Sequence, residues 1–155
     1  MIGRQDEIST LNTLTSTLID SITGFEDAAS NLDSSSRLQQ IFRERASERQ
    51  RVVEDLRAEV RRLGGNPEDD GSLMGKTHQR FLDLKAAITG RDEKAIINEV
   101  ERGEDYLKEK FETALSSGDL SSETRAAVER AYQSVRSGHD QMSQLKHGME
   151  AGSHS

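Results

Sequence analysis

The chain has 155 residues, a formal net charge of −7 and no cysteine, and its hydrophobic and charged residues each make up 32% of the sequence. This length suits one domain with a single core, while the lack of cysteine excludes disulfides, thiolate metal sites and thiol catalysis. The interspersed negative charge would repel nucleic acid, and no window reaches the roughly 20 apolar residues of a membrane-spanning helix, so we expect a cytoplasmic protein with neither partner.

The first part of the chain predicts two long helices, over residues 6–31 and 36–63, and no alternation of β-branched residues predicts a strand. Apolar residues recur in the first helix at spacings of three and four, as in one buried stripe: Ile8, Leu11, Leu14, Leu18, Ile22, Phe25, Ala29 and Leu32. Ser36 and Gln39 have the spacing of a capping box at the start of the second helix. Because the break between the helices is short, we expect them to be antiparallel neighbours.

The last part of the chain predicts a second pair of long helices, over residues 92–116 and 121–147. Asp92 can cap the first of these helices, and Ser121 or Ser122 can cap the second. The inward stripe of residues 92–116 contains Ile96, Val100, Gly103, Glu104, Leu107, Phe111 and Ala114. The stripe of residues 121–147 contains Val128, Ala131, Tyr132, Val135, His139, Met142 and Leu145.

The two helix pairs are joined by a glycine-rich connection, residues 64–91, which contains a shorter amphipathic segment at about 72–88. A connection of this size can run the full length of a bundle, and two hairpins with one long crossover have ferritin-like topology. We therefore predict an all-α, ferritin-like four-helix bundle over residues 1–155, with a short fifth helix in the crossover. The alternative is a five-helix array in which residues 72–88 form another core helix.

Several charged residues fall on the inward stripes, where an unpaired charge would be costly. Arg45 and Arg49 lie in the stripe of residues 36–63 and Glu104 lies in the stripe of residues 92–116. Under the crossover topology these two helices run parallel, and counting from their starts puts Glu104 between the levels of the two arginines. The sequence therefore predicts a buried charge cluster of Arg45, Arg49 and Glu104, joined by fork-shaped hydrogen bonds.

The same inward residues also suggest a metal site. A histidine surrounded by carboxylates from neighbouring helices is typical of metal centres in helical bundles. The candidate ligands, for iron, manganese or zinc, are Glu26, Glu48, Glu101, Glu104 and His139. The Glu-x-x-His motifs of a di-iron bundle are incomplete, because Arg51 follows Glu48 and Arg136 precedes His139 at the three-residue spacing. A core histidine bonded to an acid explains these residues without any metal.

A set of short motifs occurs in order along nearly the whole chain. They are Gly24-Phe25, the Gly-Gly-x-Pro-Glu and Gly-x-x-His elements within residues 60–96, Glu-Arg-Gly-Glu-Asp at 101–105, and His139-Asp140. In these motifs the chain resembles a group of small bacterial ferritin-like four-helix-bundle proteins, catalogued as a domain of unknown function. The resemblance implies a ferritin-like fold with an acid-rich helical core, and it implies no established reaction.

Three classes of function stay open on these grounds. The first is a ferritin-like metal-handling protein. The second is a metal-free structural or interaction bundle that can form a homodimer through an exposed helix face. A hydrolase ranks last, because the sequence offers no nucleophile–base constellation and no phosphate-binding glycine loop. No catalytic residue and no small-molecule substrate can be named, so the sequence leaves open whether the protein is an enzyme. An arginine in the space beside the carboxylates would favour the metal-free bundle.

Overall fold

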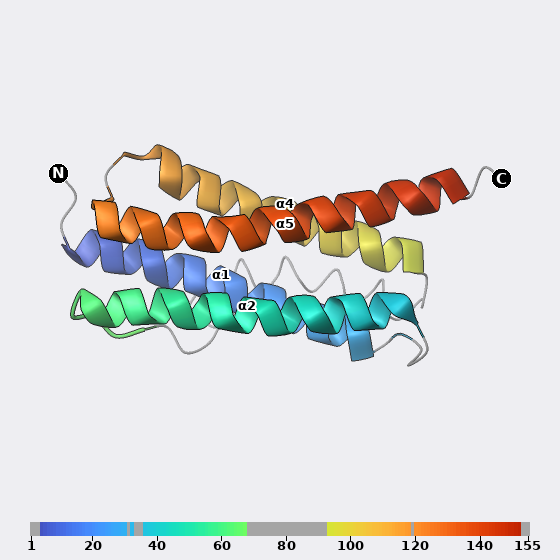
Figure 1. Cartoon of the computed structure of the whole chain (residues 1–155), viewed down its shortest axis with the longest axis horizontal. Helices are drawn as coiled ribbons and strands as arrows, with labels where there is room; N and C mark the ends of the chain where they lie inside the picture. The colour runs from blue at the N-terminus through green and yellow to red at the C-terminus, as the bar shows by residue number, and fades with distance from the viewer. Residues whose placement is uncertain (1–3, 31, 33–35, 68–92, 119, 153–155) are drawn as a thin grey trace.

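The computed structural model describes residues 4–30, 32, 36–67, 93–118 and 120–152, and in these residues it contains four helices and no strand (Figure 1). The helices are α1 (Arg4–Ser30), α2 (Arg37–Arg62), α4 (Glu93–Ser116) and α5 (Ser122–Gly152). The all-α prediction is confirmed. The expected short helix at 72–88 lies outside the described residues.

The turn between α1 and α2 explains why the helices end where they do. The Ser36 hydroxyl accepts a hydrogen bond from the Leu38 amide at 3.2 Å, as expected for a helix N-cap. Gln39 does not complete a capping box. Its side-chain amide instead donates to the carbonyls of Ala29 and Leu32, at 2.8 and 3.2 Å, and so ties the end of α1 to the start of α2.

Glycines with positive φ end α2 and α4. Gly64 has φ of 85° and Gly118 has φ of 73°, values that other residues adopt only with strain. The Gly65 amide donates to the Val60 carbonyl at 2.9 Å, which closes the last turn of α2. At its far end, α5 continues to Gly152, whereas the sequence predicts that this helix ends near residue 147. Glycines near a helix end cost about 1 kcal/mol each, which is too little to stop a helix.

The helices alternate in direction around a common core. Helices α1 and α5 run one way along the molecule and α2 and α4 run the other way (Figure 1). The neighbouring pairs are α1–α2, α4–α5, α2–α5 and α1–α4, and each of these four pairs is antiparallel, whereas α2 is parallel to α4. Helix α2 ends beside the start of α1, where the Asn12 side-chain amide donates to the Asn66 carbonyl at 3.0 Å. Helix α4 begins at the opposite end of the molecule.

Apolar side chains from all four helices form one buried cluster. Its centre includes Phe25, Phe42, Phe111 and Met142, and each of these side chains contributes about 1.5–3 kcal/mol by leaving water. The buried stripe of α5 passes through Gly138, so the sequence-based placement of His139 at the centre of that stripe is off by one residue. No described helix is apolar over enough residues to cross a bilayer.

Candidate functional site

Arg49 of α2 and Glu104 of α4 form an ion pair in the middle of the core. Nη2 of Arg49 donates to Oε1 of Glu104 at 2.5 Å, and Nη1 donates to Oε2 at 3.0 Å. The side chains are 0% and 2% exposed, so the pair is shielded from water. Two parallel charge-assisted hydrogen bonds fix the relative position of the two helices along their axes, because both the distance and the plane of the guanidinium are constrained.

Helices α1 and α5 complete the surroundings of this pair. The Ser21 hydroxyl oxygen lies 2.5 Å from Nη1 of Arg49 and accepts from it, and the ring of Phe25 lies below the guanidinium with its centroid 5.5 Å away. A Cβ on Gly138 would stand 2.8 Å from Oε1 of Glu104 and closer still to Nη2 of Arg49. We call Ser21, Arg49, Glu104 and Gly138, one residue from each helix, the mid-core cluster.

Arg45 lies one turn before Arg49 and contacts different residues. Its Nη1 donates to Glu48 at 2.7 Å, its Nε donates to Gln141 at 2.8 Å and its Nη2 donates to Ser137 at 3.1 Å. Both oxygens of Glu104 are already taken by Arg49, and Arg45 turns towards the border of α2 and α5 instead. The sequence predicts one cluster with two arginines, whereas the structure places the two arginines in two separate hydrogen-bonding groups.

The candidate metal ligands lie in different surroundings. Glu26 is exposed on α1. Glu48 accepts from Arg45, and Glu101 accepts from Lys146 at 3.1 Å. Glu104 belongs to the mid-core cluster, so three of the four candidate glutamates have a cation as their partner.

The fifth candidate, His139, lies at the border of α4 and α5 with 18% of its side chain exposed. Its Nε2 is 2.5 Å from Oδ1 of Asp105 and its Nδ1 is 3.3 Å from Oδ1 of Asp140. Across the described parts of the chain, no three His, Asp or Glu side chains converge closely enough to hold a metal ion. The described residues, in this arrangement, therefore do not fit a metal centre.

Three residues of these sites escape the sequence analysis, namely Ser21, Gly138 and Asp105. Ser21 lies between two apolar stripe residues of α1 and is small enough to look like filler. Gly138 has the right spacing from Val135 for the buried stripe of α5, and this spacing is the signal that could have found it. Asp105 directly follows Glu104 and lies about 100° further round the helix, where it meets α5.

A second polar group holds the first turn of α5. It consists of Glu59, Arg62 and Thr124, and we call it the end clamp. The Glu59 carboxylate of α2 accepts from the Arg62 guanidinium at 2.6 and 2.9 Å and from the Thr124 hydroxyl at 2.9 Å. Glu7 of α1 accepts from the Ser121 amide at 2.6 Å. Carboxylates at a helix N-terminus are favourable because unpaired amides point at them. The hydrogen bond from Arg62 is the main reason why the pKa of Glu59 is lowered, and burial opposes it.

Comparison with known families gives a match over most of the chain. The model of a family described as "Domain of unknown function (DUF2383)" matches residues 6–117. The match includes α1, α2 and α4, and with them three of the four residues of the mid-core cluster. No curated protein shows a significant match to the chain.

Proposed function

The chain thus belongs to the DUF2383 family, and we propose that it is a metal-free, ferritin-like helical bundle that acts by contact, as a structural or interaction module. The observation that carries this proposal is the position of the Arg49 guanidinium. A ferritin-like bundle gathers its metal ligands in the core between facing helices, and here a fully buried cation binds both oxygens of the one buried glutamate on α4.

The charge of Arg49 makes this region unsuited to a second cation. At an effective dielectric constant of about 20, a divalent ion about 4 Å from a guanidinium is repelled by about 8 kcal/mol. Carboxylates would have to outweigh that repulsion, and Glu104 is the one candidate glutamate whose side chain is almost fully buried. A metal ion bound by Glu104 would therefore require Arg49 to leave its hydrogen bonds with Glu104 and Ser21.

The rival proposal is a protein that handles iron, manganese or zinc through Glu26, Glu48, Glu101, Glu104 and His139. It is supported by two carboxylates beside His139, those of Asp105 at 2.5 Å from Nε2 and of Asp140 at 3.3 Å from Nδ1. A rearrangement that freed these carboxylates would be needed, since both nitrogens of the ring already have a partner.

Metal content separates the two proposals. Protein purified without a histidine tag would be analysed by mass spectrometry before and after anaerobic incubation with Fe(II), together with a His139→Ala variant. We expect well below one metal ion per chain in all samples. One or two metal ions per chain, lost in His139→Ala, would overturn the metal-free proposal. Sedimentation over a range of protein concentrations then tests the homodimer, which would appear as an increase in sedimentation coefficient with concentration.

A further inference from the structure

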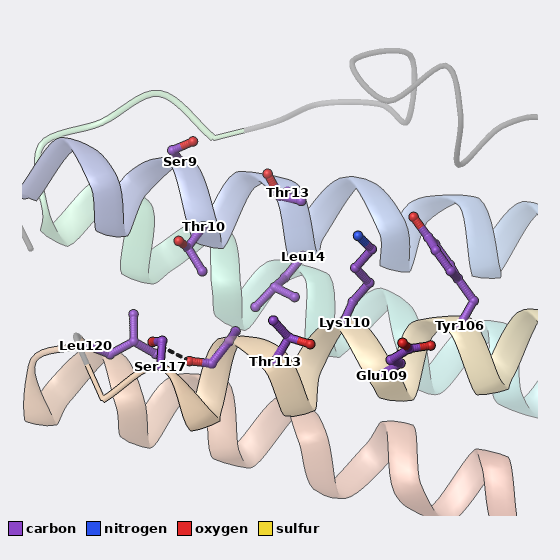
Figure 2. A pocket seen from close by; sticks show the side chains of 11 residues that line it. Ser9, Thr10, Thr13, Leu14, Tyr106, Glu109, Lys110, Thr113, Ser117 and Leu120 are labelled. Atoms are coloured by element: carbon purple, nitrogen blue, oxygen red, sulfur yellow. Dashed lines mark hydrogen bonds between the residues drawn. The ribbon is translucent and has the colours of Figure 1, made fainter.

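A groove of about 590 Å³ runs between α1 and α4 (Figure 2). Its volume falls within the range of small-molecule binding sites. On α4 and just past its end it is lined from Tyr106 to Ser117, positions that are eleven residues apart and correspond to about 16 Å along a helix. The groove is therefore elongated along the helix axis. No residue of the mid-core cluster lines it.

Lys110 lines this groove and has an unusual environment for a cation. It is half-buried, it points from α4 towards α1 (Figure 2), and no carboxylate of the described residues lies within salt-bridge distance of it. Its ammonium lies 5.3 Å from the ring centroid of Tyr106. The other described cations that lack a carboxylate partner are all exposed: Arg37, Arg43, Arg51, Arg61 and Arg136. Because a partly buried charge without a partner is costly, an anion in the groove would be stabilised here.

The rest of the groove combines three apolar side chains with five hydroxyl side chains, which are Ser9, Thr10, Thr13, Thr113 and Ser117. The apolar side chains are Leu14 of α1, Ala114 of α4 and Leu120. Leu14 lies between Lys110 and Leu120 along the groove (Figure 2). Glu109 also lines the groove, and its negative charge disfavours a ligand with two negative charges. The groove thus has one cationic residue, three apolar contacts among hydroxyl side chains, and a nearby carboxylate that favours a monoanion over a phosphate dianion.

We propose that this groove binds a linear carboxylate with an apolar chain, such as a medium-chain fatty acid anion. The carboxylate accepts hydrogen bonds from the Lys110 ammonium, and the chain lies over Leu14, Ala114 and Leu120. The proposal goes beyond the function proposed above. It does not depend on the metal content of the core, so the two can fail separately.

Isothermal titration of the full chain with octanoate tests this proposal. We expect saturable binding of one octanoate per chain, no saturable binding of acetate, which lacks the chain, and none of octylammonium, which has the wrong charge. Lys110→Met should weaken octanoate binding at least about tenfold, or about 1.4 kcal/mol. The matched control is Lys108→Met, which removes the same charge from α4 at a residue that pairs with Glu112 outside the groove, and binding should not change.

Other outcomes would overturn the proposal. They are a lack of saturable octanoate binding, equal binding of octylammonium, or equal effects of Lys110→Met and Lys108→Met. A dimer that dissociates on addition of octanoate would overturn the proposal too, because a second copy of the chain would then be the natural occupant of the groove. Amide chemical shifts of the wild-type protein give a readout that does not depend on the folding of any variant. On addition of octanoate, the shifts of Lys110 and Ala114 should change and those of Gly138 should not.

Discussion

At the scale of single residues, the pair of Arg49 and Glu104 matters more for the specificity of helix packing than for the stability of the fold. A buried ion pair often contributes no more than an apolar pair of the same volume, because both charges lose their hydration. What an apolar pair would not supply is direction, since a carboxylate and a guanidinium must meet in one plane. We infer that the pair fixes the register of α2 against α4, and that Ser21 and Gly138 bring the other two helices into the same arrangement.

The first prediction concerns Glu104→Gln. The substitution keeps the size of the side chain but leaves the charge of Arg49 buried without a counter-ion, so it should lower the free energy of unfolding by about 3 kcal/mol or more. Urea unfolding followed by circular dichroism at 222 nm measures this change. Glu101→Gln is the matched control on α4, because Glu101 pairs with the partly exposed Lys146, and it should change the free energy of unfolding by less than about 1 kcal/mol.

A double variant separates a lost ion pair from a general sensitivity of this region. Arg49→Met combined with Glu104→Leu removes both charges and keeps an apolar core, so it should recover most of the stability lost in Glu104→Gln. If the double variant loses as much free energy of unfolding as Arg49→Met and Glu104→Leu lose separately when added together, the charges do not act as a pair. A free energy of unfolding unchanged by Glu104→Gln would contradict the buried pair directly.

The second prediction concerns Gly138→Ala. The added Cβ would lie 2.8 Å from Oε1 of Glu104 and would also overlap Nη2 of Arg49, and neither atom can move without loss of a hydrogen bond. Overpacking of this kind lowers the free energy of unfolding by about 1–3 kcal/mol. Gly148→Ala is the control on the same helix, where a Cβ meets no atom within 4 Å. Alanine should there stabilise α5 by up to about 1 kcal/mol, so changes of the same sign in both variants would refute the steric explanation.

At the scale of helices, the end clamp joins the last turn of α2 to the first turn of α5. Glu59 lies in that last turn, and its carboxylate is shared between Arg62 of its own helix and Thr124 of α5. The clamp acts far from the mid-core cluster, which lies near the middle of both helices. Two separate contacts along one helix pair restrict the angle between the helices as well as their register.

The third prediction concerns the pH dependence of the end clamp. The pKa of Glu59 is lowered from 4.5 in the folded protein, chiefly by the hydrogen bond from Arg62. Its contribution to stability is therefore fully present above pH 4.5 and is lost as the pH falls through the lower folded pKa. Glu59→Gln should lower the free energy of unfolding by about 1 kcal/mol at pH 7, with a smaller effect at pH 3.

A matched control for this prediction lies on the same helix. Glu54 pairs with Arg57 at the same three-residue spacing, but its side chain is 58% exposed and solvent screens the pair. Glu54→Gln should therefore have little effect at either pH. Equal effects of Glu59→Gln at pH 7 and pH 3 would mean that the carboxylate charge has no part in the clamp.

Comparison of these helices with the sequence shows what spacing can and cannot resolve. Apolar spacing of three and four residues was enough to find all four helices, because burial of one face is the main force that forms them. Counting residues from the predicted starts of the two parallel helices also placed Glu104 close to the level of Arg49. Neighbouring positions on one helix differ by about 100° in direction. A buried stripe is about this wide, so apolar spacing alone does not show which of two neighbours points to its centre. For this reason Gly138 was missed beside His139, and the partners of Arg45 on α5 could not be foreseen.

At the scale of the whole molecule, the mid-core cluster connects the two helix hairpins, together with apolar contacts, the end clamp and the hydrogen bonds of Arg45 to α5. The packing is closest within each hairpin, α1–α2 and α4–α5, and less extensive between them. A bundle with weakly joined hairpins would unfold in two steps. Because the apolar core is shared by all four helices and each helix contributes one residue to the cluster, we instead expect the hairpins to unfold together, as one domain.

The fourth prediction tests this cooperativity with two probes. The chain has two tyrosines and no tryptophan, and both tyrosines, Tyr106 and Tyr132, belong to the α4–α5 hairpin. Tyrosine emission therefore reports on that hairpin, whereas circular dichroism at 222 nm reports on all four helices. The two urea transitions should have the same midpoint, and Glu104→Gln should shift both by the same amount. A circular dichroism transition without a matching change in tyrosine emission would mean that α1 and α2 unfold on their own, and that the buried pair does not join the two halves of the bundle.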